Sequence, residues 1–580
     1  MNKWETAYEK WNSFQNLDPS LKKDLKDIKN DKIKLEDAFY KELSFGTGGM
    51  RGVLGPGINR MNIYTIRKAV NGLANYLKVN CVNVNDRGVV VAYDSRYMSQ
   101  EFALETAKVL GSYGIKAYVF NELHPTPVLS FAVRNLGAVA GVMITASHNP
   151  PEYNGFKVYN EDGGQIVPDE AAEIISYIEQ TENELTVPFI EQTELEDKGL
   201  LTWIGSEVDN AYLEQLKQIS KLGEAELEKD KALDIVFTPL HGTSHDLVLR
   251  GLAQLSFPHV HIVEEQAKPD PEFSTVASPN PEEHQAFKMA IEKGNNVDAD
   301  ILIGTDPDAD RLGVAVRDAD QSFKVLTGNQ LGALLLDYSL SHSDQAMLSN
   351  ARVLKTIVTT ELGRAIATHY GAKTIDTLTG FKYIGEKIRQ FDSTGETFIF
   401  GFEESYGYLI SSFARDKDAV QAAMMACEMA YYWKEQGKTL LEALDSLYAK
   451  HGYFLEGMSS LTLKGKEGSD KIALIMEDVR KNPLTEVAGL RVEKMEDYAT
   501  GERTIFGESN EQETMDLPKE NALKFILDKN SWVCLRPSGT EPKIKCYYGV
   551  CQETKEISQK SLESLKEAMD QVINRVVQHG

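Results

Sequence analysis

Three aspartates alternate along one short loop. In GTDPDADRLG, Asp306, Asp308 and Asp310 stand between two apolar runs, which predicts a loop between two strands. Carboxylates held this close repel one another unless a cation neutralises them, and oxygen ligands suit a hard cation. A calcium-binding EF-hand is excluded because its sixth and twelfth positions are Arg311 and Arg317 here. We therefore expect one Mg²⁺ ion per chain, with a solvated acidic turn as the alternative.

A serine follows another apolar run. Val139 to Ile144 predicts a buried strand, and Ser147 comes shortly after it in TASHNPP. A serine hydrolase would place its nucleophile in GxSxG, and the flanking residues do not form that pattern. A serine that accepts a phosphoryl group needs a metal and a cation nearby, and the aspartate loop and Lys157 would supply them. The alternative is a serine that only caps the end of a strand.

Three further loops are rich in polar groups. RPSGTEPKIK begins at Arg536 and offers a guanidinium, hydroxyls and turn N–H groups, which suits phosphate binding. GFEESYG contains Glu403 and Ser405, which suit the vicinal hydroxyls of a sugar. FGTGGMRG is not a dinucleotide loop, because Arg51 stands where the third glycine is required. It predicts either a phosphate-binding loop or a plain turn.

The elements that would position these loops recur three times. A strand-helix-strand-helix-strand order runs from Arg87 to Ser147, again from Ala232 to Asp306, and again from Ala351 to Ser405. Such units build mostly parallel sheets with both faces covered. Each unit ends in one of the polar loops. Because ligands of parallel sheets bind beyond the carboxyl ends of the strands, we expect one composite site in a central cleft between domains.

The end of the chain has a different pattern, in which alternating strand segments flank helices. We therefore expect three similar α/β domains with mixed or parallel sheets and a C-terminal α+β domain. The first forty residues are expected to be helical, with Asp18 as a cap before Pro19. The expected domains are 1–210, which contains the serine loop, 211–324, which contains the metal loop, 325–455, which contains the sugar loop, and 456–580, which contains the phosphate loop.

Composition limits the class of protein. Among the 580 residues, 42% are hydrophobic and 26% are charged, as in globular proteins generally. The formal net charge of −25 argues against nucleic acid or an anionic membrane as the main partner. The five cysteines form no CxxC pattern, the N-terminal segment is too polar for a signal peptide, and no 18-residue apolar run occurs. We expect a cytoplasmic protein.

Together the loops TASHNPP, GTDPDADR, GFEESYG and RPSGTEP resemble those of the α-D-phosphohexomutase family, in the family's order and one per domain. The resemblance covers nearly the whole chain. The length, the FGTGGMRG segment and GFEESYGYL are most similar to the bacterial phosphoglucomutase branch that is related to phosphopentomutases.

The resemblance implies roles for individual residues. Ser147 would be the phosphorylated serine, and it would bind the metal together with the three aspartates. The catalytic residues would be Ser147, Lys157, Arg311 and His148, with Lys157 as a candidate general acid or base. The residues that bind the substrate would be Arg51, Glu403, Ser405, Lys382, Arg536, Ser538, Gly539 and Thr540.

The sequence departs from the family pattern at two places. Phe402 stands in the sugar loop where glutamate is usual, and Phe381 stands in TLTGFKYIG where relatives have histidine or tryptophan. These changes affect the choice of sugar rather than the chemistry.

The implied activity is interconversion of α-D-glucose 1-phosphate and D-glucose 6-phosphate through a glucose 1,6-bisphosphate intermediate, which would also be the activator. The alternatives on the same scaffold are a phosphopentomutase and a phosphomannomutase. A serine hydrolase and a non-enzymatic cation-binding protein are rival classes, but both leave the sugar and phosphate loops unexplained. We expect a small phosphosugar as partner, no nucleic acid or membrane, and a monomer or weak dimer.

Overall fold

The computed structural model describes residues 2–46, 48–463, 465–507, 510–538 and 543–579. The chain forms two compact units. The first unit comprises Met1–Thr327, Phe381–Gly401 and Ser405–Gly437, and the second comprises Gly328–Gly380, Phe402–Glu404 and Lys438–Gly580. In the described part of the chain, no helix has both the length and the apolar character needed to cross a membrane.

Three helices open the chain, as predicted: α1 (Lys3–Ser13), α2 (Pro19–Ile28) and α3 (Lys32–Phe39). The carboxylate of Asp18 accepts hydrogen bonds from the backbone N–H groups at the start of α2, and Pro19 occupies its first turn. Both features stabilise a helix N-terminus. Trp11 is completely buried and donates to Glu184, which anchors these helices to the first α/β domain.

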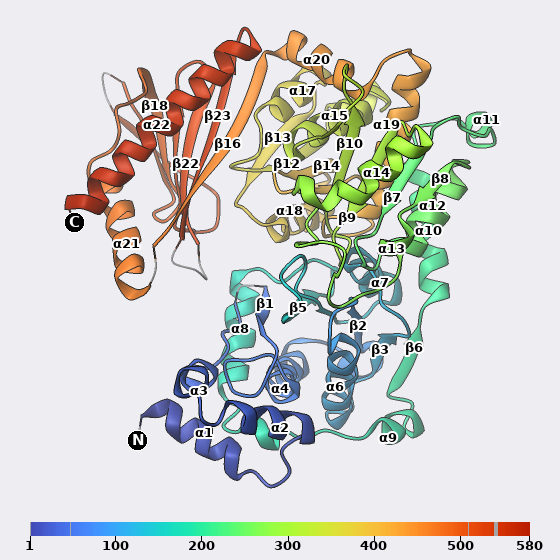
Figure 1. The fold of residues 1–580 in the computed structure, drawn as a ribbon, viewed down its shortest axis with the longest axis vertical. Helices are drawn as coiled ribbons and strands as arrows, with labels where there is room; N and C mark the ends of the chain where they lie inside the picture. Colours follow the sequence, from blue (N-terminus) through green and yellow to red (C-terminus); the bar gives the residue numbers. More distant parts are fainter. Residues whose placement is uncertain (1, 47, 464, 508–509, 539–542, 580) are drawn as a thin grey trace. The chain divides into compact units, whose positions relative to one another are not determined.

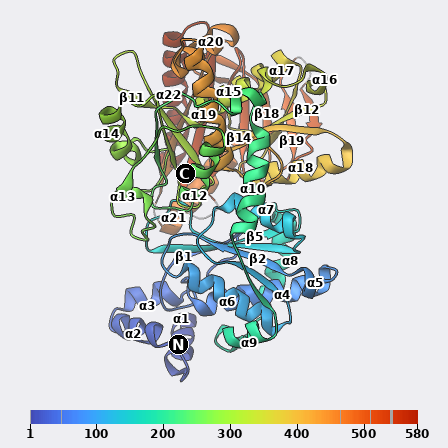
Figure 2. The ribbon, with the colours of Figure 1, turned by 90° about the vertical axis from the view of Figure 1, so that its right-hand side faces the viewer.

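The first domain contains a six-stranded sheet of order β1-β5-β4-β2-β3-β6. Strands β4, β2, β3 and β6 are neighbours that run parallel, and β5 is antiparallel to both β4 and β1. Helices α4 and α6 cover one face of the sheet and α7 covers the other (Figure 2). All five residues of β2 (VVVAY) are buried, as expected for a strand covered on both faces. The strands are β1 (Gly49–Val53), β2 (Val89–Tyr93), β3 (Ala117–Phe120), β4 (Ala140–Ile144), β5 (Tyr153–Asn160) and β6 (Leu201–Ile204). The helices are α4 (Ile63–Asn80), α5 (Val84–Arg87), α6 (Ser99–Ser112), α7 (Thr126–Leu136), α8 (Pro168–Glu179), α9 (Gln192–Asp197) and α10 (Ser206–Ile219).

The second domain contains a five-stranded sheet of order β11-β10-β9-β7-β8. Strands β9 and β10 are antiparallel neighbours, and the aspartate loop connects them. The prediction that this loop lies between two strands is confirmed. The strands are β7 (Ile235–Thr238), β8 (Val260–Ile262), β9 (Ile301–Thr305), β10 (Leu312–Arg317) and β11 (Phe323–Val325). The helices are α11 (Glu224–Leu227), α12 (His245–Gln254), α13 (Glu264–Ala267) and α14 (Lys288–Val297), and α18 (Phe381–Thr394) and α19 (Ala419–Glu435) also belong to the first unit.

The second unit begins with the third predicted repeat. Strands β12 (Ala351–Thr356) and β13 (Lys373–Thr377) pair in parallel, and α17 (Leu362–Tyr370) connects them. The fully buried ring of Phe402 lies so close to Gly332 and Gly363 that a β-carbon on either glycine would clash with it. Phe402 is therefore a core residue packed against α15 and α17. The other elements of this region are α15 (Gly328–Ser341), α16 (Gln345–Leu348) and α20 (Leu440–His451). Strand β14 (Thr397–Glu403) begins in the first unit and ends in the second, and β15 (Gly407–Leu409) belongs to the first.

The C-terminal domain is an antiparallel sheet in which the order β16-β23-β22-β21-β18-β19-β20 is extended by β17 beside β18. Figure 1 shows the long helix α22 lying along β23 and β16. The strands are β16 (Tyr453–Thr462), β17 (Glu486–Val487), β18 (Leu490–Asp497), β19 (Glu502–Ile505), β20 (Glu511–Thr514), β21 (Leu523–Leu527), β22 (Ser531–Pro537) and β23 (Lys543–Gln552). The helices are α21 (Gly465–Lys481) and α22 (Lys555–His579).

The predicted fold class is confirmed: α/β regions with mixed sheets precede a C-terminal α+β domain. The predicted boundaries after residues 210, 324 and 455 fall inside α10, β11 and β16.

Candidate functional site

The serine loop and the aspartate loop meet in the first unit. Ser147 Oγ lies 3.2 Å from Asp306 Oδ2 and 3.1 Å from His148 Nδ1. Ser147 is buried, and its φ of 55° lies in the left-handed region that non-glycine residues rarely adopt. Such strain persists only where the surroundings hold it, and it is common at functional sites. The two loops predicted to share one site are brought together.

Arg96 holds the backbone of the serine loop. Its Nη2 donates to the carbonyl oxygen of Ser147 at 2.6 Å and also to that of Asn149. Its Nη1 donates to the carbonyl oxygens of Pro150 at 2.9 Å and Tyr153 at 3.1 Å. Only a planar guanidinium can bind this many acceptors with fixed geometry. The sequence reasoning missed Arg96, because nothing near it in DSRYMS indicates which loop it contacts.

The aspartate loop is fixed by its own backbone. Asp306 Oδ1 accepts from the N–H groups of Asp310 and Arg311, both at 3.0 Å. Gly242 packs against Pro307, since a β-carbon at Gly242 would lie 2.4 Å from the proline backbone. These contacts leave Asp306 Oδ2 to face Ser147.

The three aspartates fit a metal ion. They are almost completely buried, and each offers a carboxylate oxygen within 4.8 Å of the others. Asp308 Oδ1 and Asp310 Oδ1 have no hydrogen-bond partner among the described residues. Burial and the two neighbouring aspartates raise the pKa of Asp306 well above its usual range. A bound cation would satisfy these oxygens and allow all three groups to ionise.

Two lysines approach the aspartates. Lys157 Nζ lies 2.8 Å from Asp308 Oδ2 and 3.5 Å from Asp310 Oδ2, and Lys417 Nζ lies 2.8 Å from Asp310 Oδ2. Lys157 was predicted, whereas Lys417 was not. Lys417 immediately precedes Asp418, the N-cap of α19, so its sequence context in RDKDA is that of an ordinary helix start.

The charges perturb the nearby pKa values in opposite directions. Burial disfavours charged Lys157, but Asp308 and Asp310 outweigh burial and raise the pKa of its ammonium. Burial, followed by the cations Arg311 and Arg51, lowers the pKa of His148 to about 3. In this structure Lys157 is therefore a cation and His148 is neutral.

The first unit also contains the other predicted residues of its loops. Arg51 on β1 donates to Asn149 Oδ1 at 2.6 Å, which joins the FGTGGMRG loop to the serine loop. Arg311 pairs with Glu282 at the edge of the aspartate loop. Ser405 precedes Tyr406, whose carbonyl oxygen accepts from the N–H of Leu312 on β10.

Lys382 and Phe381 lie at the start of α18. Lys382 Nζ is 5.2 Å from the centroid of the Tyr383 ring. Phe381 is buried, with 3% of its surface exposed. Phe381, one of the two residues that depart from the family pattern, is therefore part of the core.

The remaining predicted residues belong to the second unit. Glu403 is 5% exposed at the end of β14, and its neighbour Glu404 accepts from the hydroxyl groups of Thr356 and Thr359. Arg536 Nε donates to Glu520 Oε1 at 2.6 Å, and the N–H of Ser538 donates to the carbonyl oxygen of Lys543. Gly539 and Thr540 lie outside the described residues.

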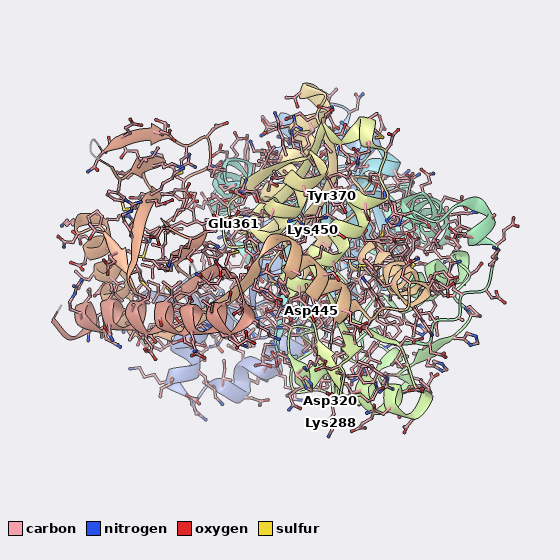
Figure 3. All side chains as sticks on the ribbon, turned by 90° about the horizontal axis from the view of Figure 1, so that it is seen from above. Lys288, Asp320, Glu361, Tyr370, Asp445 and Lys450 are labelled. Atoms are coloured by element: carbon pink, nitrogen blue, oxygen red, sulfur yellow. The ribbon has the colours of Figure 1, made fainter. Side chains whose placement is uncertain are left out.

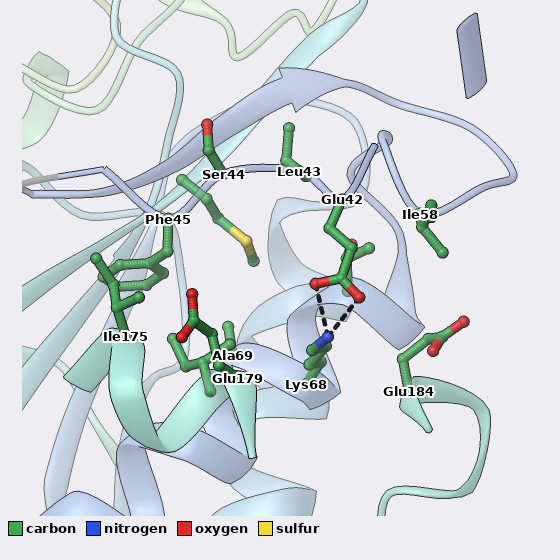
Figure 4. Close-up of a pocket in the computed structure, with 13 residues that line it drawn as sticks. Glu42, Leu43, Ser44, Phe45, Ile58, Lys68, Ala69, Ile175, Glu179 and Glu184 are labelled. Carbon is green, nitrogen blue, oxygen red and sulfur yellow. Dashed lines mark hydrogen bonds and ion pairs between the residues drawn. The ribbon is translucent and has the colours of Figure 1, made fainter. Parts of the chain in front are cut away.

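A separate cavity of about 270 Å³ lies in the first unit between α4, α8 and the segment before β1 (Figure 4). Its walls are mostly apolar, and an ion pair between Glu42 and Lys68 stands at its edge. None of the predicted site residues lines it.

Comparison with known families gives four matches in chain order. They are phosphoglucomutase/phosphomannomutase alpha/beta/alpha domain I over residues 42–185, domain II over 210–320, domain III over 327–451 and the C-terminal domain over 472–567. The chain is 41% identical over 533 residues to a phosphoglucomutase of Staphylococcus aureus, covering 91% of this chain and 93% of the relative. It is 41% identical over 548 residues to a phosphoglucomutase of Staphylococcus epidermidis, covering 94% and 97%.

Two solved structures have a similar fold. A putative phosphomannomutase from Thermus thermophilus has a TM-score of 0.66 at 23% identity, and the match covers 92% of this chain and 99% of that one. Parafusin from Paramecium, described as a phosphoglucomutase in an open form, has a TM-score of 0.67 at 16% identity, with 93% and 96% covered.

Proposed function

The chain belongs to the phosphoglucomutase/phosphomannomutase family, and from this premise we propose that it interconverts α-D-glucose 1-phosphate and D-glucose 6-phosphate. The observation on which the proposal rests is the hydroxyl of Ser147, presented by a strained loop to a buried cluster of three aspartates and two lysines. The relatives named phosphoglucomutase favour glucose over pentose or mannose.

The reaction begins from phosphorylated Ser147. The bond between phosphorus and Ser147 Oγ breaks as a bond forms to the 6-oxygen of glucose 1-phosphate. The proton of the 6-hydroxyl passes to Ser147 Oγ as it leaves, so the products are glucose 1,6-bisphosphate and a free serine hydroxyl. The bisphosphate then reorients in the site. Ser147 Oγ takes the phosphoryl group from the 1-position, its proton passes to the oxygen at that position, and glucose 6-phosphate is released. In such transfers positioning and electrostatic stabilisation account for most of the catalysis.

Several residues position the transfer or move its proton. His148 Nδ1, 3.1 Å from Ser147 Oγ, is placed to accept a hydrogen bond from the serine hydroxyl and so to orient its oxygen when the phosphoryl group returns. Lys157, an ammonium in this structure, is placed to stabilise the transferring phosphoryl group and, as a general acid, to donate a proton to an oxygen that leaves phosphorus. Arg311 contributes further positive charge at the same edge of the site. Arg96 keeps the loop in place during both transfers.

A Mg²⁺ ion would be held by Asp306, Asp308 and Asp310 together with phosphorylated Ser147. When bound, it offsets the negative charge on the transferring phosphoryl group. The three aspartates fit this ion because they offer hard oxygen donors close together, and because two of their oxygens lack hydrogen-bond partners among the described residues.

The sugar and its second phosphate need their own contacts. We assign the sugar hydroxyls to Glu403 and Ser405. We also assign Arg51 and Lys382 to the binding of this substrate. Arg536 and Ser538, with Gly539 and Thr540, grip the phosphate that is not being transferred, since a guanidinium and hydroxyls suit its oxygens.

An initial-rate assay tests the proposal. α-Glucose 1-phosphate, mannose 1-phosphate and ribose 1-phosphate are compared by kcat/KM with Mg²⁺ and a trace of glucose 1,6-bisphosphate. We expect glucose to lead by at least about tenfold, which corresponds to roughly 1.4 kcal/mol. A lead for ribose would instead indicate a phosphopentomutase.

A further inference from the structure

A cavity of about 540 Å³ lies inside the second unit. One wall is the start of α17 with the end of β13, and the other is one face of the C-terminal sheet. Glu361, labelled in Figure 3, stands at the N-terminus of α17 and lines the cavity. The volume is within the range of small-molecule sites.

The strand register places the lining residues of the sheet on a single face. Glu496 is paired with Lys524 and with Arg503, and Ile526 is paired with Lys494 and with Trp532. Directly paired residues share a face, and so do residues two apart along a strand. These side chains therefore form one continuous polar and aromatic surface.

The opposite face of the same strands packs into the hydrophobic core. Leu523, Phe525 and Val533 belong to the cluster that contacts α21 and α22. The core therefore does not need the charged face. The cations on that face require an explanation of their own.

The acids of the cavity are already neutralised. Lys355, which is completely buried, lies 3.0 Å from Glu361 and 3.1 Å from Asp376, and Arg364 pairs with both carboxylates. On the sheet, Glu496 accepts from Arg503 and from the hydroxyl of Tyr498.

Two further lysines have fewer partners: Lys494 has none among the described residues, and Lys524 has one long ion pair. Lys494 makes no side-chain hydrogen bond or ion pair among the described residues, although it lines the cavity. Lys524 is 4% exposed; its one hydrogen bond in the described part of the chain goes to the carbonyl oxygen of Ile357, and Glu361 is 3.7 Å away. Its ammonium also lies 4.8 Å from the ring centroid of Trp532. A buried ammonium with spare N–H groups favours an anion beside it.

We propose that this cavity binds a small phosphomonoester with an apolar or ring-shaped body. Lys494 and Lys524 bind the phosphate, and Trp532, Ile526 and Phe454 contact the body of the ligand. The formal charge of −25 over the chain makes a local excess of cations more significant, because the rest of the surface repels such a ligand. The site is separate from the residues assigned to phosphoryl transfer.

Calorimetric titration of the full chain with phenyl phosphate tests the site, with Lys494→Gln as the variant. Lys450→Gln is the matched control, because Lys450 is an exposed lysine of the same unit that does not line the cavity and lies 5.5 Å from the Tyr370 ring (Figure 3). We expect the wild type and the control to share a site that Lys494→Gln weakens by at least about fivefold. Inorganic phosphate should bind this site more weakly than phenyl phosphate does.

Identical isotherms for all three proteins, or no binding to the wild type, would overturn the proposal. Equal affinity for phosphate and phenyl phosphate would also overturn it, because the apolar wall would then contribute nothing. Without phenyl phosphate, Lys494→Gln should keep the wild-type kcat/KM for glucose 1-phosphate. A loss of turnover in this variant would mean that Lys494 serves the catalytic site instead, which contradicts the proposal without touching the proposed reaction.

Discussion

Ser147 Oγ and Asp306 Oδ2 lie 3.2 Å apart although 159 residues separate them in the chain. The contact joins the carboxyl end of β4 to the carboxyl end of β9, two parallel-sheet strands of different domains in one unit. Ligands gather at such strand ends. A phosphoryl group on this serine would therefore stand directly beside the aspartates that fit a metal ion.

Arg96→Lys should leave the chain folded and lower kcat. A lysine keeps the positive charge beside Asp94 but cannot replace a fork that binds four carbonyl oxygens of the serine loop. A displacement of the reacting group by an ångström can reduce the rate by about a hundredfold. The measurement is kcat together with the Mg²⁺ dependence of activity. Unchanged kcat would show that the loop keeps its position without the guanidinium.

Lys417→Met should lower kcat/KM by about a hundredfold, as expected when a positioned charge near a transferring phosphoryl group is removed. The affinity of the Lys417→Met variant for Mg²⁺ should be at least as high as that of the wild type. The reason is that Lys417 is a cation 2.8 Å from Asp310, so its removal takes away a competitor for the carboxylate. Calorimetry with Mg²⁺ measures the affinity. Weaker Mg²⁺ binding would instead assign Lys417 to the support of the metal site.

Asp308→Asn should raise the Mg²⁺ concentration needed for half-maximal activity by at least about tenfold, because a hard cation loses one anionic ligand. Asp320→Asn is the control: Asp320 is an exposed carboxylate of the same domain, bonded to Ser322 in the turn between β10 and β11 (Figure 3). Chelation of divalent ions should abolish the activity of the wild type. Equal Mg²⁺ dependence of the two variants would count against the aspartate loop as the metal site.

The free energy of unfolding of the chain should decrease as the pH rises from about 4 to about 6, because Asp418 ionises in this range. Burial raises the pKa of this carboxyl from 3.8 to about 6, against hydrogen bonds from Gln421 and Tyr212. The folded state then binds more protons than the unfolded state in this window, so unfolding becomes easier as the pH rises and levels off above it. A pKa shift of this size means that ionisation of Asp418 lowers the free energy of unfolding by roughly 3 kcal/mol.

Asp418→Asn should remove most of that slope, because an amide does not ionise. Urea unfolding at a series of pH values gives the free energy of unfolding for the wild type and the variant. Asp445→Asn, at an exposed carboxylate on α20 (Figure 3), should keep the wild-type slope. An Asp418→Asn curve parallel to that of the wild type would contradict the assignment.

Local patterns were sufficient to predict much of the fold. The apolar run before Ser147 and the two runs around the aspartates became β4, β9 and β10, since alternation and burial are properties of short segments. The pairing of the serine loop with the aspartate loop followed from the rule for strand ends.

Contacts across long stretches of chain could not be predicted in the same way. Arg96 and Lys417 contact the site from positions whose neighbours in sequence indicate no role. Phe402 was interpreted as a possible determinant of sugar choice, whereas it is packed against two glycines of neighbouring helices. Burial of this kind depends on tertiary packing.

Ser147 is the residue that we propose to carry the transferred phosphoryl group. The most direct test is peptide mass mapping of the chain after incubation with glucose 1,6-bisphosphate and Mg²⁺, alongside Ser147→Ala. We predict one phosphoryl group on the peptide containing Ser147, none in the variant, and a loss of kcat of at least about a thousandfold, or roughly 4 kcal/mol, in a variant that remains folded. A phosphoryl group on another residue, or a folded variant with wild-type turnover, would contradict the account.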